Sequence, residues 1–198
     1  KNIYKKLYKR VYKNLVFSIY ENNVYVADNV GFVYSIDYLS GKVNWIKNYG
    51  VPIKSDIKIY EGKIFLIDQD NKIFALDIKD GSQIWDVLSM SSFIKSQNLL
   101  SLAISKNGDL FAITSSADVF KIETSTGNIA WSRNTAESLL TDATDFFTSS
   151  QIVYTEGQII FSSGKSIFAF DENDGNTMWV NEINSVDTPI IDKNNIFI

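Results

Sequence analysis

The chain has 198 residues, of which 45% are apolar and 14% aromatic, so it can bury a sizeable core rich in strand-forming side chains. Its formal net charge of −4 excludes the basic surface that general nucleic-acid binding requires. It contains no Cys and no His, which excludes disulfides, thiolate nucleophiles, imidazole bases and the usual zinc sites. We therefore expect no catalytic residue, no metal and no cofactor.

The first segment in chain order, residues 1–13, is basic and carries six cations and no acid. Its apolar residues recur at the spacing of one helix face: Ile3, Tyr4, Leu7, Tyr8, Val11 and Tyr12. A basic amphipathic helix can lie on an anionic membrane surface or on an acidic partner. Tyr and Val also suit strands, so the interpretation we favour is a linker or the remnant of a preceding structural unit.

An internal repeat dominates the rest of the chain. Four segments align without gaps over eleven residues: Ser35–Trp45, Ala75–Trp85, Lys121–Trp131 and Ala169–Trp179. Each has an acid at its third position: Asp37, Asp77, Glu123 and Asp171. Each has glycine four residues later: Gly41, Gly81, Gly127 and Gly175. Each ends with tryptophan: Trp45, Trp85, Trp131 and Trp179. All four tryptophans of the protein occupy this position, which indicates a repeat architecture.

The apolar residues around each repeat run in short blocks between turn signals, which predicts strands and not helices. In the second copy we expect strands at Asp56–Tyr60, Lys63–Asp68, Lys72–Asp77 and Gln83–Val87. Glycine, Asp and Asn separate these strands at hairpin spacing. The sequence predicts an all-β propeller of four-stranded antiparallel blades at residues 14–48, 54–88, 99–133 and 150–182, with a partial fifth blade at 188–198. We expect this to be part of a seven- or eight-bladed ring, and the chain to be a fragment.

The acid, the glycine and the tryptophan have distinct expected roles. The acid can accept backbone N–H bonds inside the last turn of the blade, and glycine can adopt the positive φ of that turn. The tryptophan is large enough to lie between neighbouring blades, where its truncation to alanine would cost roughly 3–5 kcal/mol. We therefore assign all twelve repeat residues to structure.

The repeat resembles the pyrroloquinoline-quinone (PQQ) type, A-x-D-x-x-T-G-x-x-x-W. Lys121 and Glu123 depart from its Ala and Asp, and only Thr126 matches its Thr. Two kinds of protein carry such repeats: quinoprotein dehydrogenases, and the BamB-like lipoproteins of the outer-membrane β-barrel assembly machinery. The chain is more similar to the second kind, because it lacks the Cys pair or His of the dehydrogenases. Its segment 185–191, which includes Asp187, is similar to the Val-Asp-Thr-Thr-Pro-Val-Val strand start of the lipoproteins.

The resemblance implies a non-enzymatic protein-interaction scaffold in outer-membrane protein assembly of a Gram-negative envelope. It implies a periplasmic location, a lipidated N-terminal anchor that is not present in this chain, and a β-barrel assembly component as partner. The alternative is a fragment of a PQQ-dependent dehydrogenase, which would hold quinone and Ca²⁺ on the propeller axis. A propeller sensing domain of a larger receptor is a third reading.

Partner contacts are expected in two long connections between blades, because loops on a rigid scaffold carry recognition. The candidates in residues 86–98 are Met90, Phe93 and Ile94, and those in residues 132–149 are Arg133, Leu139, Leu140, Asp142, Asp145, Phe146 and Phe147. Leucine and phenylalanine flanked by acids and one arginine suit a partner surface. The alternative is that they pack beneath their own loops. Asp142 and Asp145 lack a third ligand, so we assign them no metal.

An incomplete ring would leave blade faces uncovered, which is a liability for aggregation. We therefore expect self-association of two chains through these open faces. Membrane contact is expected only through an anchor outside this chain or, weakly, through residues 1–13.

Overall fold

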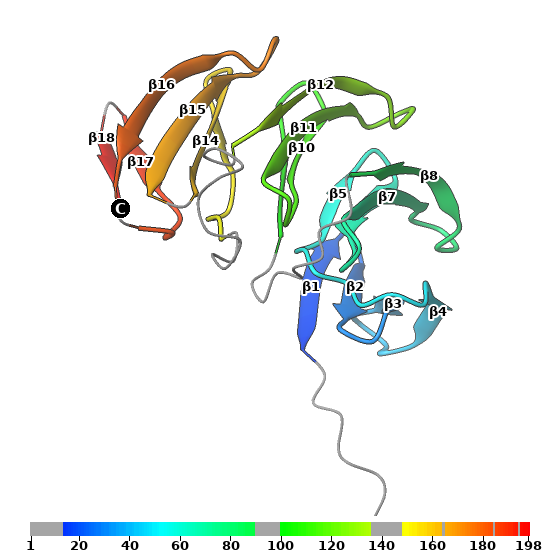
Figure 1. Cartoon of the computed structure of the whole chain (residues 1–198). Coiled ribbons are helices and arrows are strands. Elements are labelled where there is room, and N and C mark those ends of the chain that lie inside the picture. The colour runs from blue at the N-terminus through cyan, green and yellow to red at the C-terminus, as the bar shows by residue number, and fades with distance from the viewer. Residues whose placement is uncertain (1–13, 90–99, 136–147, 164, 184, 194) are drawn as a thin grey trace, which may run out of the picture.

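The computed structural model describes residues 14–89, 100–135, 148–163, 165–183, 185–193 and 195–198. Within these residues the chain forms four four-stranded antiparallel sheets and a two-stranded sheet, which follow one another along an open arc (Figure 1). In each four-stranded sheet the strands pair in sequence order. The predicted all-β fold of four-stranded blades is therefore confirmed. Within the described residues, no helix is long and apolar enough to cross a membrane.

The strands of each blade are short and similar in length. Blade 1 consists of β1 (Leu15–Tyr20), β2 (Asn23–Asp28), β3 (Phe32–Asp37) and β4 (Val43–Asn48). Blade 2 consists of β5 (Lys58–Tyr60), β6 (Lys63–Ile67), β7 (Lys72–Asp77) and β8 (Gln83–Leu88). Blade 3 consists of β9 (Ser101–Ile104), β10 (Asp109–Ile113), β11 (Asp118–Glu123) and β12 (Ile129–Asn134).

Blade 4 consists of β13 (Val153–Thr155), β14 (Gln158–Ser163), β15 (Ser166–Asp171) and β16 (Thr177–Glu182). The two-stranded sheet consists of β17 (Ile190–Asp192) and β18 (Asn195–Phe197). The expected second blade differs from the structure only at strand ends: β5 begins at Lys58 and not at Asp56, and β8 extends to Leu88. Strand ends are the least determined part of a sequence-based assignment.

The hydrophobic core lies between the blades. In β6 alternate side chains point to opposite faces, so Ile64 and Leu66 pack toward blade 1 while Phe65 and Ile67 pack toward blade 3. All four are fully buried. A strand buried on both faces needs a continuous apolar run, which explains the sequence Lys-Ile-Phe-Leu-Ile of β6.

Each blade contains the same irregularity beside its repeat tryptophan. The pairing of the third and fourth strands shifts register between Ser35 and Ile36, and at the matching positions of the other three blades. Such a shift marks a β-bulge, which inserts one extra residue into the outer strand and redirects its side chains. The bulge therefore helps to aim each tryptophan at the next blade.

Candidate partner-binding face

The repeat tryptophans join each blade to the next one. The indole Nε1 of Trp45 donates to the carbonyl of Ile78 at 3.1 Å. Trp85 and Trp131 make the same bond to Thr124 and Glu172, at 3.1 Å and 3.0 Å. Each indole is thereby held at the turn between the third and fourth strands of the following blade. These tryptophans therefore have a structural role.

Three of the four repeat glycines lie directly beneath these indoles. A Cβ added at Gly81 would come within 2.8 Å of Trp45, at Gly127 within 2.8 Å of Trp85, and at Gly175 within 2.6 Å of Trp131. These glycines also have φ values of 72°, 80° and 66°. The position needs glycine for two reasons: the left-handed backbone and the close approach of the indole.

The repeat acids act within their own turns. The Asp37 carboxylate accepts the Ser40 backbone N–H at 2.7 Å, and Asp77 accepts that of Lys79 at 2.8 Å. Asp171 accepts the Asn173 N–H at 2.7 Å. Glu123, whose side chain is longer, instead accepts the Thr126 hydroxyl at 2.9 Å. The Ser40 hydroxyl also donates to the Asp37 carboxylate. This bond, followed by the one from the Ser40 backbone N–H, lowers the pKa of Asp37.

The blade topology places every connection between blades at one end of the molecule. The chain enters a blade at its inner strand and leaves it from the outer strand after three hairpins, so it exits at the end where it entered. The turn between the second and third strands lies at this end too. We call this end the connection face. The first three residues of each expected connection, 86–88 and 132–134, belong to the outer strands β8 and β12, and both connections start at this face.

Most predicted partner contacts cannot be placed. The following candidates lie outside the described residues: Met90, Phe93, Ile94, Leu139, Leu140, Asp142, Asp145, Phe146 and Phe147. What the structure does place is the start and the end of each long connection.

One carboxylate, that of Asp118, holds the start of both long connections. Its Oδ2 accepts a hydrogen bond of 2.7 Å from the hydroxyl of Ser89, the first residue after β8. Its Oδ1 accepts a hydrogen bond of 2.7 Å from the side-chain amide Nδ2 of Asn134, the last residue of β12 before the second connection. Ser116 donates its hydroxyl to the same Oδ2 at 2.8 Å. We call these four residues the Asp118 cluster.

Backbone bonds fix the same region. The Thr135 N–H donates to the Ala117 carbonyl at 3.0 Å. At the far end of the first connection, the Leu100 N–H donates to the Lys54 carbonyl at 2.6 Å. At the far end of the second, the Ile152 N–H donates to the Ser101 hydroxyl at 2.7 Å. The two connections thus leave and rejoin a rigid frame at neighbouring points.

Arg133 and Asp187 are the two candidates within the described residues. The Arg133 guanidinium donates to the carbonyls of Asp174 at 2.7 Å and Ser132 at 2.8 Å, so it ties blade 3 to blade 4. The Asp187 carbonyl accepts the Ser162 hydroxyl at 2.7 Å, and its carboxylate is exposed. The Asp187 carboxylate also accepts the Ser185 hydroxyl at 3.2 Å, whereas the Arg133 guanidinium is bonded to carbonyls of blades 3 and 4.

Sequence reasoning missed the Asp118 cluster. Asp118 begins β11, and a polar residue at the start of a strand is interpreted from sequence as an ordinary turn residue. Its partners are 29 and 16 residues away in the sequence, and no spacing rule links them. Only the stacking of blades 2 and 3 brings Ser89 to this carboxylate.

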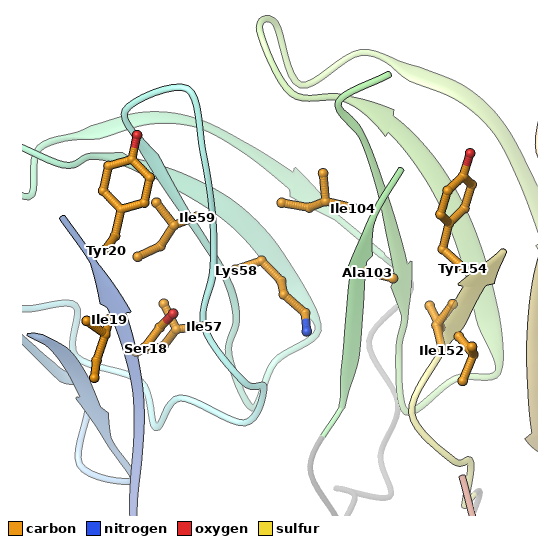
Figure 2. A pocket seen from close by; sticks show the side chains of 11 residues that line it. Ser18, Ile19, Tyr20, Ile57, Lys58, Ile59, Ala103, Ile104, Ile152 and Tyr154 are labelled. Carbon is orange, nitrogen blue, oxygen red and sulfur yellow. The ribbon is translucent and has the colours of Figure 1, made fainter. Parts of the chain in front are cut away.

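The dehydrogenase alternative can be tested against the inner strands, which border the propeller axis. A cavity of about 610 Å³ lies there between β1, β5, β9 and β13, and Figure 2 shows its wall of isoleucines and tyrosines. Lys58 is its one charged wall residue among those described, and the Asp56 carboxylate lies 2.7 Å from the Lys58 Nζ. Ca²⁺ requires several oxygen ligands, usually carboxylates, and the described lining contains neither Asp nor Glu. Among the described residues, no group of three or more acids, His or Cys is placed to hold a metal ion.

Four-stranded blades stacked face to face through Trp–Gly joints define the protein as a β-propeller with PQQ-type blades. The family model described as outer membrane protein assembly factor BamB matches residues 12–198. The chain belongs to this family.

Individual relatives are distant. The outer membrane protein assembly factor BamB of Nitrosomonas eutropha is 23% identical over 163 residues, which are 80% of this chain and 39% of the relative. The crystal structure of BamB from Moraxella catarrhalis superposes with a TM-score of 0.78 and 16% identity, over 89% of this chain and 54% of that one. The crystal structure of the computationally designed protein Ika8 superposes with a TM-score of 0.68 and 13% identity, over 91% of this chain and 53% of that one. The chain thus spans about half the length of each of these two solved chains, and these likenesses show the fold.

Proposed function

We propose that this protein is a non-enzymatic scaffold that binds a protein partner in outer-membrane β-barrel assembly. The observation that carries the proposal is the family match over residues 12–198, which includes all four blades. The internal use of the repeat residues supports it, because acids, glycines and tryptophans are all engaged in turns and joints. A periplasmic location and anchoring by a lipid belong to the same proposal.

We place the partner surface on the connection face. The apolar residues of the two long connections, from Met90 to Ile94 and from Leu139 to Phe147, supply its contacts, and the exposed Asp187 carboxylate contributes at the next blade. The Asp118 cluster holds the starts of both connections on one turn, so they act as a single surface. A few apolar anchors surrounded by polar residues are typical of a protein interface.

The test is capture of partners from a solubilised Gram-negative envelope fraction, with identification by mass spectrometry. Two variants replace residues 90–98 or 136–147 by a short Gly-Ser turn. Ser125→Ala, an exposed change at the opposite end of blade 3, is the matched control. We expect the whole chain and the control to capture a β-barrel assembly component, and both loop variants to lose it.

Two results would contradict the proposal. One is capture of the assembly component that survives both loop replacements, which would place the partner surface elsewhere. The other is binding of PQQ with Ca²⁺ accompanied by dye-linked oxidation of an alcohol or a sugar, which would assign the chain to the dehydrogenases.

A further inference from the structure

A second cavity, of about 360 Å³, opens between blades 1 and 2 at the end opposite the connection face. Tyr25 and Ser35 form its floor, and each is only 2% exposed. Tyr20, Asn23 and Asn44 stand around this floor. The volume lies within the range of small-molecule sites, which is roughly 300–1,000 Å³.

The polar groups of this cavity are already ordered by one another. The Asn44 Nδ2 donates to the Asn23 Oδ1 at 2.8 Å and to the Ser35 hydroxyl at 3.3 Å. The Tyr25 phenol is protonated at neutral pH and can donate, and burial raises its pKa further above the ordinary value. Hydroxyls and amides can each donate and accept, so the floor offers both kinds of hydrogen bond.

The corresponding space between blades 2 and 3 is closed. There the ring of Tyr60 covers Gly108, and a Cβ at Gly108 would come within 2.4 Å of it. Tyr20 is the counterpart of Tyr60 at the end of the inner strand, and Gly62 is the counterpart of Gly108. A Cβ at Gly62 would meet only Ile78, at 3.8 Å. Tyr20 therefore leaves its glycine uncovered, and the space remains open.

Two residues around the opening are polar, whereas their counterparts in blade 2 are apolar. Ser35 pairs with Trp45 as Ala75 pairs with Trp85, and Asn44 precedes Trp45 as Ile84 precedes Trp85. Blade 1 thus has a hydroxyl and an amide where blade 2 has apolar groups. These two polar side chains line the opening at the joint of blades 1 and 2.

We propose that this pocket binds a neutral polyhydroxylated small molecule of about the size of a monosaccharide. The hydroxyls of such a ligand donate and accept, as the amides of Asn23 and Asn44 and the hydroxyl of Ser35 do. The Tyr20 ring supplies an apolar surface for the C–H face of a sugar ring. Glu21 and Lys79 also line the pocket, and their opposite charges offset each other, so neither a cation nor an anion is favoured. This site is independent of the partner surface on the connection face.

The experiment uses the full chain with D-glucose and glycerol as uncharged probes, and with glycine as a zwitterion that carries one positive and one negative group. Binding is followed by NMR through the side-chain amide signals of Asn23 and Asn44, and by calorimetry. We expect glucose to shift both amide signals saturably, and glycine to shift neither.

The double variant S35A/N44I gives blade 1 the residues of blade 2. It should weaken glucose binding by at least about tenfold, as expected for the loss of hydrogen bonds worth about 1.4 kcal/mol. I84N, the reverse exchange in blade 2, is the control and should leave binding unchanged. Circular dichroism and the urea midpoint verify that each variant folds.

Three outcomes would overturn the proposal. The first is the absence of any shift with glucose and glycerol. The second is glucose binding that S35A/N44I leaves intact while the variant is folded. The third is binding of glycine in preference to glucose, which would show that the charged side chains and not the polar floor select the ligand.

Discussion

At the scale of single residues, the four repeat glycines occupy the same turn in different surroundings. Gly41 and Gly127 both have positive φ, 69° and 80°. Gly127 lies under the Trp85 indole, whereas a Cβ at Gly41 would meet nothing within 4 Å. The strain of the turn and the crowding of the joint can therefore be separated by one substitution at each position.

We expect Gly41→Ala to cost about 1–2 kcal/mol, the penalty of a left-handed alanine. Gly127→Ala carries that penalty and also displaces Trp85 from the Thr124 carbonyl, so it should cost at least about 1–2 kcal/mol more. Urea unfolding of both variants measures the difference. Equal losses would show that the close approach of the indole contributes nothing to stability.

Asp68 and Asp37 are predicted to respond to pH in opposite ways. Burial raises the pKa of the Asp68 carboxyl, although N–H groups of Lys72 and Asp70 oppose this rise. The folded state then holds the proton of Asp68 more tightly than the unfolded chain does. The free energy of unfolding therefore falls as pH rises from the ordinary pKa of an aspartate, about 4, through the raised pKa of the folded state. Asp68→Asn keeps an acceptor for both N–H groups, and should reduce this loss.

Asp37 has a lowered pKa because the Ser40 hydroxyl and backbone N–H bind its ionised form. Its contribution to stability is present above the ordinary pKa of an aspartate and is lost as pH falls through the lowered folded value. Asp37→Asn should remove that acid-side loss. Urea midpoints of the wild type and of both variants between about pH 3 and 7 verify the two signs. Shifts of the same sign in both variants would contradict the assignment.

At the scale of elements, the Asp118 cluster joins the end of blade 2 and the end of blade 3 through a turn of blade 3. Asp118→Ala removes the acceptor of Ser89 and Asn134 together. We expect faster hydrogen exchange at the Thr135 amide, which donates to the adjacent Ala117 carbonyl, and weaker capture of the partner. Thr126→Ala, which removes a side-chain bond to Glu123 at the opposite end of the same blade, is the control. Unchanged exchange at Thr135 would show that the cluster does not hold the connection.

At the scale of the whole molecule, blade 1 presents one sheet face to solvent. On β1 the side chains of Leu15, Phe17 and Ile19 are 55%, 71% and 65% exposed. The equivalent faces of blades 2 to 4 are buried against their neighbours. An apolar face of this kind favours association, and we propose that two copies of this chain associate through such faces.

Sedimentation velocity tests this association across a range of protein concentrations. We expect a concentration-dependent mass for the wild type and a monomer for Phe17→Glu, because a charge on the face opposes its burial. Leu88→Glu is the matched control, since Leu88 is equally exposed, at 71%, but lies on the outer strand β8. A wild type that stays monomeric at every concentration would contradict the proposal.

The repeat, the four-stranded blade and the joint between blades can all be predicted from the amino-acid sequence. The spacing from acid to glycine to tryptophan reflects contacts within one hairpin, and the apolar blocks reflect strands buried on both faces, so both can be read from one chain. The prediction that the tryptophans lie between blades matches the bonds of Trp45, Trp85 and Trp131. The family resemblance followed from the same eleven residues.

Which polar residues of different blades meet depends on how the blades pack together. Asp118, Ser89 and Asn134 come together because blades 2 and 3 stack, and the pocket over Tyr25 and Ser35 exists because Tyr20 leaves Gly62 uncovered. Neither arrangement has a period or a spacing, since each depends on the orientation of two separately folded sheets. Local geometry leaves a pattern in a sequence, whereas a contact between distant segments leaves none until the chain has packed.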